Sequence, residues 1–130
     1  MLITSIPQYI QSVTNAKVKL SDTSATTLYT APTDADFNAS IVNSILVAEQ
    51  SGNADTITVT LTDTASSPVT FTLFKVKAVD ANTTIELLTR DLVLKSGEIL
   101  KVQAATGSRL HVTASIQQLS RRRISTSSAL

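Results

Sequence analysis

Few side chains in this chain of 130 residues could carry acid–base or nucleophilic chemistry. His111 is the single histidine, and a catalytic histidine needs a nucleophile or an orienting carboxylate beside it. Nothing close to His111 in the sequence supplies either group. The alternation of the surrounding residues places its side chain on the outward face of a strand. We therefore interpret His111 as a surface residue and expect no enzymatic activity.

Acidic residues raise the possibility of a calcium site. Asp34 and Asp36, joined in the fold by Asp22 or Asp55, could supply carboxylate ligands. However, the EF-hand spacing is absent, and calcium takes about six to eight oxygen ligands. Aspartate is also common in turns, because its side chain hydrogen-bonds to nearby backbone. We expect a plain turn here.

A second acidic group, Glu86, Asp91 and Glu98, could contain an acid/base pair. Each of these carboxylates has a basic residue nearby, so surface ion pairs explain them more simply. The chain has no cysteine and no Gly-x-Gly phosphate loop. We therefore predict neither a metal site nor a cofactor.

The charge balance limits the partners. The formal net charge is +1 and 16% of residues are charged, below the ordinary fraction of about a quarter. A nearly neutral body argues against whole-face nucleic-acid binding, which needs a basic patch. No apolar run approaches the ~20 residues that span a bilayer, and the start lacks the basic region of a signal peptide. We expect no membrane partner, no nucleic-acid partner and no signal peptide.

Arg121, Arg122 and Arg123 form the single run of like charge. They could contact DNA phosphates or an acidic neighbour, or they could lie in a solvated tail. Three charges give a weak, salt-sensitive contact. If this end of the chain is ordered, the contact interpretation is favoured.

Short strands must position all of these residues. Apolar and polar residues alternate with period two from Ala16 to Leu119, and the three glycines fall in turns between strand-like runs. About eight short strands with regular turns indicate one all-β domain, an antiparallel β-sandwich. Jelly-roll and Ig-like arrangements both fit.

Two strands depart from simple alternation. In the first, Phe37, Ala39, Ile41, Ile45 and Val47 share one parity, while Val42 and Leu46 take the other, which predicts that its second face is also covered.

In the second, parity switches after Leu73, which predicts a β-bulge or a bend. Parity places Phe37, Phe71 and Phe74 in the core.

A row of threonines marks a third strand. Thr56, Thr58, Thr60 and Thr62 alternate with apolar residues, so one face is a line of hydroxyl groups. Such a face can stay solvated, because an antiparallel sheet can have one wet side. It could also contact a neighbouring subunit or hydrogen-bond a sugar. Against a glycan site, aromatic residues are only 4% of the chain and tryptophan is absent.

The two ends lie outside the sandwich pattern. We predict an N-terminal arm over residues 1–15, a sandwich over 16–119 and a C-terminal arm over 120–130. Ile3, Ile6, Ile10 and Val13 recur at helical spacing, so the first arm is either a short helical turn near Pro7 or an extended segment. The second arm has the composition of a flexible tail. If both are ordered, we expect a neighbouring subunit to hold them.

Three stretches carry a resemblance to a known class: LYTAP at Leu28 to Pro32, LVLKSGEILKV at Leu92 to Val102, and LHVTAS at Leu110 to Ser115. In this order they resemble elements of small β-sandwich virion proteins of tailed bacteriophages. The resemblance covers about Leu20 to Leu119. Its elements are structural, so it transfers no catalytic or binding residue.

The resemblance implies a non-enzymatic building block of a virion. Its partners would be further copies of itself and other virion proteins, such as the major capsid protein or neck and tail proteins. A capsid decoration or cement protein at the particle surface is the first expectation. The alternatives are a neck, collar, tail or fibre-attachment component, or a glycan-binding module for host attachment.

Under this interpretation the candidate assembly contacts are apolar residues of the N-terminal arm, two strand residues outside the main parity, and the arginine run. They are Ile3, Ile6, Tyr9, Ile10, Val42, Leu46, Arg121, Arg122 and Arg123.

Overall fold

The predicted all-β fold is confirmed in the computed structural model, which describes the backbone of residues 5–125 and the side chains of residues 12–120. Nine strands and no helix occur in that part of the chain. The strands are β1 (Ser5–Lys19), β2 (Thr26–Thr30), β3 (Phe37–Glu49), β4 (Asp55–Asp63), β5 (Val69–Val79), β6 (Thr84–Glu86), β7 (Leu92–Leu94), β8 (Ile99–Ala104) and β9 (Leu110–Ser125).

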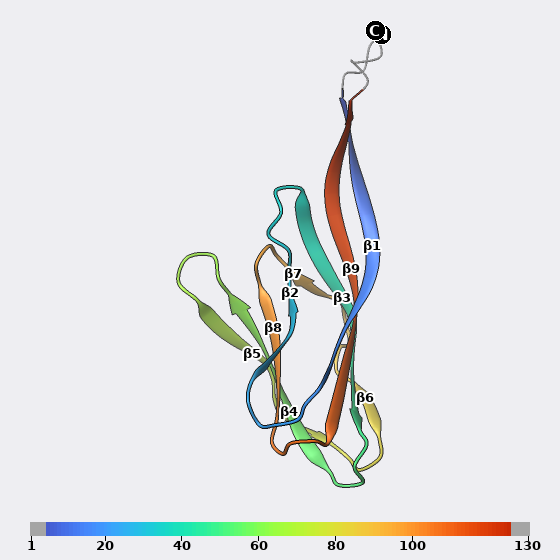
Figure 1. Cartoon of the computed structure of the whole chain (residues 1–130), viewed down its shortest axis with the longest axis vertical. Coiled ribbons are helices and arrows are strands. Elements are labelled where there is room, and N and C mark those ends of the chain that lie inside the picture. The colour runs from blue at the N-terminus through green and yellow to red at the C-terminus, as the bar shows by residue number, and fades with distance from the viewer. Residues whose placement is uncertain (1–4, 126–130) are drawn as a thin grey trace.

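Two antiparallel sheets make up the sandwich (Figure 1). The first sheet has the order β1-β9-β3, and the short strands β6 and β7 both pair with β3. The second sheet has the order β2-β8-β4-β5. Apart from the β4–β5 hairpin and the step from β6 to β7, each connection crosses from one sheet to the other.

This strand order identifies a jelly roll. If β6 and β7 are taken as one interrupted strand beside β3, eight strands remain, divided four to each sheet. In the first sheet β1 lies next to β9, and in the second sheet β2 lies next to β8. Strands from the beginning and the end of the chain are neighbours in this way in the two Greek keys of a jelly roll. The Ig-like alternative does not fit, because Ig sheets do not interleave early and late strands in this way.

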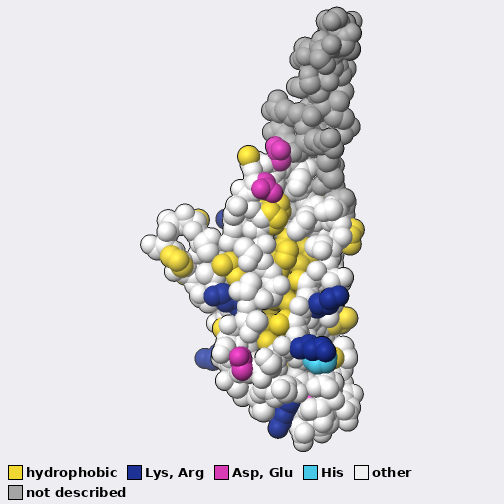
Figure 2. All heavy atoms as spheres, in the orientation of Figure 1, with side chains coloured by type: hydrophobic (Ala, Val, Ile, Leu, Met, Phe, Trp, Pro, Cys, Tyr) yellow, Lys and Arg dark blue, Asp and Glu magenta, His cyan; other side chains and the backbone are white. Residues whose placement is uncertain are grey.

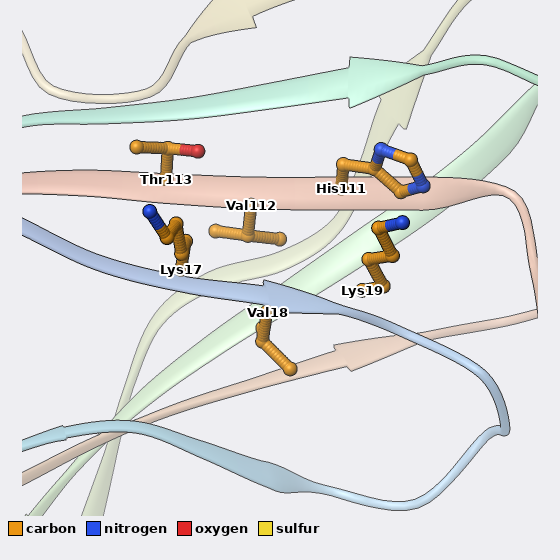
Figure 3. A pocket seen from close by; sticks show the side chains of 6 residues that line it. All are labelled: Lys17, Val18, Lys19, His111, Val112 and Thr113. Atoms are coloured by element: carbon orange, nitrogen blue, oxygen red, sulfur yellow. The ribbon is translucent and has the colours of Figure 1, made fainter.

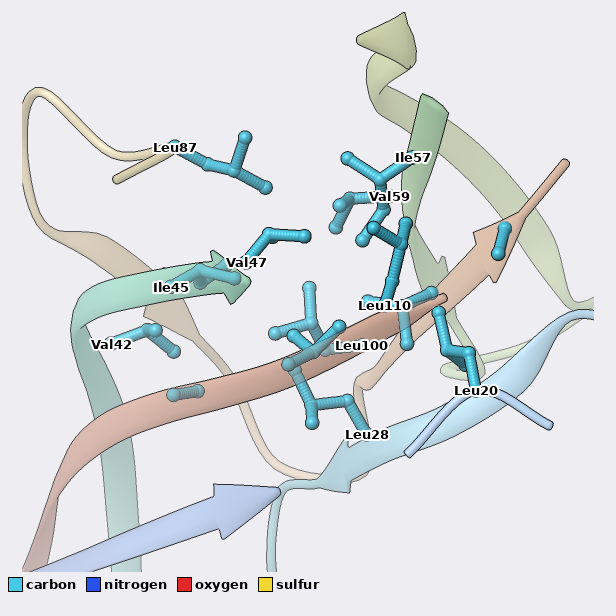
Figure 4. Close-up of a cluster of buried hydrophobic side chains, with 14 of the residues drawn as sticks. Leu20, Leu28, Val42, Ile45, Val47, Ile57, Val59, Leu87, Leu100 and Leu110 are labelled. Carbon is cyan, nitrogen blue, oxygen red and sulfur yellow. The ribbon is translucent and has the colours of Figure 1, made fainter. Parts of the chain in front are cut away.

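The core lies between the inner faces of the two sheets (Figure 4). Ile45 and Val47 of β3 meet Val59 of β4 and Leu100 of β8 in this layer, and all four are 0% exposed. Because strand side chains alternate, every second residue of these strands enters the core. The alternation predicted for the threonine strand β4 is confirmed, since Ile57 and Val59 are both 0% exposed.

The parity predicted for β3 is wrong in part, because two register shifts interrupt its pairing with β9. One falls between Phe37 and Ala39 and the other between Val42 and Ser44. Each extra residue reverses which side chains face inward. As a result Val42 is 0% exposed and lies in the core, so it does not lie on a second face.

The predicted irregularity in β5 is confirmed, because its pairing with β4 shifts register twice, between Ile57 and Val59 and between Val59 and Thr60. Phe74 packs against the core as expected. The prediction for Phe71 is wrong, since this side chain is 52% exposed. The β4–β5 hairpin extends past the opposite sheet (Figure 1). Phe71 therefore has the parity of a core residue but no sheet opposite to cover it.

The turn glycines serve two physical purposes. Gly52 and Gly97 adopt φ of 85° and 78°, a region that side chains with a Cβ avoid. Gly107 is required for a different reason, since a Cβ there would lie 2.5 Å from the carbonyl oxygen of Ser21. The turn at Gly107 therefore depends on the close approach of its backbone to the backbone at Ser21.

Candidate assembly surface

A two-stranded ribbon formed by the two ends of the chain is the most distinctive surface of the molecule (Figure 1). β1 pairs with β9 along its whole length, from Lys19 opposite His111 to Ser5 opposite Ser125. The pairing of β3 with β9 ends where Phe37 meets Ser120. Beyond that point β1 and β9 continue together, and no other strand of the described residues 5–125 pairs with them.

The ribbon brings the predicted contacts of the two arms together. Tyr9 lies opposite Arg121, and Ile6 lies opposite Ile124. Ile10 is opposite Ser120, the last residue of β9 that pairs with β3.

The other two arginines are opposite Gln8 and Pro7, while Ile3 lies outside the described residues. Residues separated by more than 100 positions in sequence thus share one short ladder, which no local pattern could reveal.

The structure decides between the alternatives for the first arm, in favour of the extended segment, and corrects the second. Residues 5–13 form part of β1, so the helical turn near Pro7 is absent. Ser120 to Ser125 belong to β9, so this part of the second arm is not a tail. Each arm is therefore the other's pairing partner within the same chain.

The two-stranded part of the ribbon needs further contacts to be stable. A two-stranded sheet alone is marginally stable in water, and a third strand or a packed face is needed for independent stability. Val13, at the base of the ribbon on β1, is 77% exposed. The ribbon therefore provides free backbone edges to a partner, and Val13, in the adjoining three-stranded part of the sheet, adds exposed apolar area.

Leu46 is the second predicted contact from β3, and it lies on the outer face of the first sheet. It is 41% exposed and sits opposite Thr113 of β9 and Glu86 of β6. By contrast, Val42 cannot contact a partner because it is buried in the core. Of the two residues, only Leu46 is available for assembly.

His111 borders a shallow hollow of about 270 Å³ on the outer face of β1 and β9 (Figure 3). Lys17, Lys19 and Thr113 also line it. In Figure 3 the imidazole of His111 lies across the strands from the side chain of Lys19. The group contains cations and a hydroxyl but no carboxylate, so it has no triad geometry.

Three glutamates, Glu49, Glu86 and Glu98, accept backbone hydrogen bonds that hold turns together. Glu49, at 2% exposure, accepts hydrogen bonds from the N–H groups of Ser51 (2.8 Å), Gly52 (2.9 Å) and Asn82 (3.1 Å), and from the Ser51 hydroxyl (2.5 Å). Burial acts to raise the pKa of Glu49, but these hydrogen bonds outweigh it and lower the pKa to about 2.

Glu86 and Glu98 act in the same way. Burial acts to raise the pKa of Glu86, yet hydrogen bonds from the Ser44 hydroxyl and the N–H groups of Ile45 and Leu88 lower it. Glu98 accepts a 2.5 Å hydrogen bond from the N–H of Lys95. These carboxylates therefore have structural partners in the backbone.

Of the aspartates considered for calcium, Asp34 and Asp36 lie in the turn before β3, where the Asp34 carbonyl accepts the N–H of Phe37 at 3.0 Å, and Asp55 is the first residue of β4. The Asp22 carboxylate accepts the N–H of Ser24 at 2.9 Å, and the Asp55 carboxylate accepts that of Thr106 at 3.2 Å. Among the residues that the structure describes, no three His, Cys, Asp or Glu side chains gather as a metal site would require. No helix in the described part of the chain could cross a membrane.

The threonine row lies on the outer face of the second sheet. Thr60 and Thr62 of β4 are opposite Thr72 and Thr70 of β5, and the hydroxyls of Thr62 and Thr70 are 3.1 Å apart. The hydroxyl of Thr58 accepts the N–H of Val76 at 3.1 Å. Part of the row therefore satisfies groups within the sheet, and the rest is half-buried surface.

An exposed apolar surface on β5 was not predicted from the sequence. Val69 and Phe71 of β5 are 50% and 52% exposed. Figure 2 shows hydrophobic side chains on this projecting hairpin. Alternation predicted Phe71 in the core, and no signal in the sequence indicates that the opposite sheet stops short of it.

Comparison with known proteins supports the fold. No protein-family model matches the sequence, and no curated protein matches it. A chain in the acidic stable capsid structure of Helicobacter pylori bacteriophage KHP30 superposes with a TM-score of 0.51 and 12% identity, covering 93% of this chain and 100% of that one. At that identity the likeness is one of fold.

A lower similarity is found to chains of infectious bursal disease virus. The Gx strain chain has a TM-score of 0.47 and 10% identity, covering 94% of this chain and 38% of that one. The Gt strain chain has a TM-score of 0.46 and 13% identity, covering 92% and 33%.

Proposed function

We propose that this chain is a structural protein of a virion, in which the β1–β9 ribbon docks on neighbouring subunits. The observation that carries the proposal is the ribbon itself, which continues past Ser120 of β9 without a third strand. A protruding ribbon with free edges gains stability when a neighbour adds a strand or covers a face. That is the geometry expected of a component held in place by assembly.

The jelly-roll order supports the same function. Jelly rolls form many viral capsid domains, although lectins and enzymes also use this fold. A fold match over the full length of a chain in a phage capsid structure agrees with the proposal. Among the described residues, no three His, Cys, Asp or Glu side chains gather in a group that could hold a metal ion.

Within the virion, we propose a capsid decoration or cement protein of a tailed phage that self-associates and contacts the major capsid protein. The sequence resemblance supports a tailed-phage virion protein without fixing its position, the size of 130 residues and the net charge of +1 favour the cement position, and a neck or tail component is the alternative. A glycan-binding module is disfavoured, because the hydroxyl of Tyr29 is already bonded to Ser40 at 2.6 Å and to Gln118 at 2.7 Å. Its ring is half-buried, so it is a poor platform for a sugar.

The experiment that tests the proposal is the mass of the purified protein in solution, with and without the ribbon. The trimmed variant lacks residues 1–10 and 121–130, so β9 keeps its whole pairing with β3. We expect a defined oligomer for the full chain and a folded, smaller species for the trimmed chain, which has lost the contacts of the ribbon. Lys101→Gln, on the opposite sheet, serves as the matched control and keeps the oligomer.

Circular dichroism and a cooperative thermal transition show whether the trimmed chain is folded. A full chain that stays monomeric at all concentrations, alone and with isolated capsid shells, would overturn the proposal. Gold labelling of intact particles distinguishes the positions, since a cement protein covers the head and a neck protein labels one vertex.

A further inference from the structure

The free edge of the second sheet has two unlike halves. β5 is the edge strand of the order β2-β8-β4-β5, and its hairpin with β4 projects from the body (Figure 1). Exposed edge strands tend to pair with other chains, and proteins protect them with charges and bulges. The part of β5 that lacks such protection is therefore the part where pairing with another chain is expected.

The second half of β5 is protected. It carries Lys75 and Lys77, and the register with β4 shifts within it. Val76, between the two lysines, adopts φ of 51°, which breaks the extended backbone. A strand from another molecule cannot continue a ladder through this stretch.

The first half has none of these features. Val69 to Thr72 pair regularly with β4, from Asp63 opposite Val69 to Thr60 opposite Thr72. The stretch from Val69 to Leu73 contains no charge and no proline. Phe71 is 52% exposed and Val69 is 50% exposed on the same side of the hairpin. This half is an unprotected edge with an uncovered apolar face.

We infer that this edge pairs with the same edge of a second copy of the chain, antiparallel about a two-fold axis at Phe71. The inference rests on the proposed assembly function and specifies one of its contacts. In this register Val69 lies opposite Leu73 of the second copy, and Thr70 lies opposite Thr72. Apolar side chains then meet apolar ones on one face, and hydroxyls meet hydroxyls on the other.

Charge and proline support that register and that partner. Pairing about Phe71 leaves Pro68 and Lys75 outside the ladder. Every residue within the ladder then has an N–H to donate, and no lysine lies opposite another lysine. Moving the axis to Thr70 would place Pro68 opposite Thr72, and proline cannot donate to a ladder. A self-complementary segment is what an isologous two-fold interface requires.

The absence of cysteine from the chain makes the test direct. Opposite residues in an antiparallel pair have Cα atoms about 4.5–5.5 Å apart, within the range of a disulfide. In full-length protein under mild oxidation, Phe71→Cys should form a covalent dimer that a reductant reverses. Val69→Cys is the matched control and should not, because Leu73 lies opposite it.

Two further samples test the register and the energetics. A mixture of Val69→Cys and Leu73→Cys chains should give the crosslinked heterodimer. Phe71→Lys should weaken self-association at this contact by about a hundredfold, because two ammonium groups would meet without partners. Because Phe71 is half-exposed, Phe71→Lys should fold, as its thermal transition will show.

Failure of this contact can be separated from failure of the proposed function. Equal crosslinking by Val69→Cys, absence of crosslinking by Phe71→Cys, or capture of a different protein by this edge would each overturn the two-fold contact. If the full chain still forms an oligomer that ribbon removal abolishes, the assembly function stands without it. Crosslinking by Phe71→Cys in the trimmed chain would show that the two contacts are independent.

Discussion

The hydroxyl of Tyr29 lies 2.6 Å from the hydroxyl of Ser40 and joins the two sheets through the core. Tyr29 belongs to β2 of the second sheet, and Ser40 belongs to β3 of the first. The side-chain amide of Gln118 on β9 donates to the same tyrosine oxygen at 2.7 Å. Ser40 is 0% exposed, so water cannot replace this partner without a structural change.

Tyr29→Phe should therefore lower the free energy of unfolding by about 1–2 kcal/mol, because the buried Ser40 hydroxyl is left without its partner. Urea denaturation measures the change. Ser12→Ala is a suitable control, since its 3.4 Å hydrogen bond to Gln118 is exposed. An equal effect of the two substitutions would show that the hydrogen bond between the sheets contributes no more to the free energy of unfolding than an exposed one.

Glu49→Gln should remove part of the acid sensitivity of the fold. The folded-state pKa of Glu49 is about 2, below its ordinary value of 4.5. The carboxylate therefore stabilises the fold above pH 4.5, and this contribution is lost as the pH falls toward 2. The wild-type urea midpoint should fall across that range, whereas Glu49→Gln should be less stable at neutral pH and vary less below 4.5.

Ser51→Ala offers a graded version of that experiment. It keeps the Glu49 carboxylate but removes the 2.5 Å hydrogen bond from the Ser51 hydroxyl. The acid transition should then move to higher pH, because the folded-state pKa of Glu49 rises toward its ordinary value. Unchanged acid transitions in both variants would contradict the role assigned to this turn.

Val76→Asn should stabilise the monomer. Val76 is 60% exposed and has φ of 51°, a conformation that costs a β-branched residue about 1–2 kcal/mol and that asparagine adopts readily. We expect a gain of about 1 kcal/mol in the free energy of unfolding. Val93→Asn is the matched control, because Val93 is 56% exposed in an ordinary strand and should lose stability.

Val42→Ala tests the corrected placement of this residue. Removing two methyl groups from a fully buried site should lower the free energy of unfolding by about 2 kcal/mol, as transfer and cavity terms add. Leu46→Ala, four residues along the same strand, should change it by less than about 0.5 kcal/mol. If Leu46→Ala is the more damaging substitution in the monomer, the bulge between Val42 and Ser44 is wrongly placed.

The sequence by itself determined the class of the fold, the alternation of β4, β8 and β9 and the positions of the turns. These features are local, because a strand's period and a turn's backbone depend on residues within a few positions. The irregularity in β5 was also visible locally, as a switch of parity after Leu73.

Only the tertiary structure decided that Tyr9 lies opposite Arg121, that Val42 is buried while Phe71 is not, and that Glu49 ties two distant turns. Each depends on which strands become neighbours and where the opposite sheet ends. Ladder partners and sheet edges are set by contacts between residues far apart in the chain, and a single-residue bulge reverses the faces of a strand. For that reason the surfaces proposed here for assembly, the ribbon and the edge of β5, could be located only once the strand order was known.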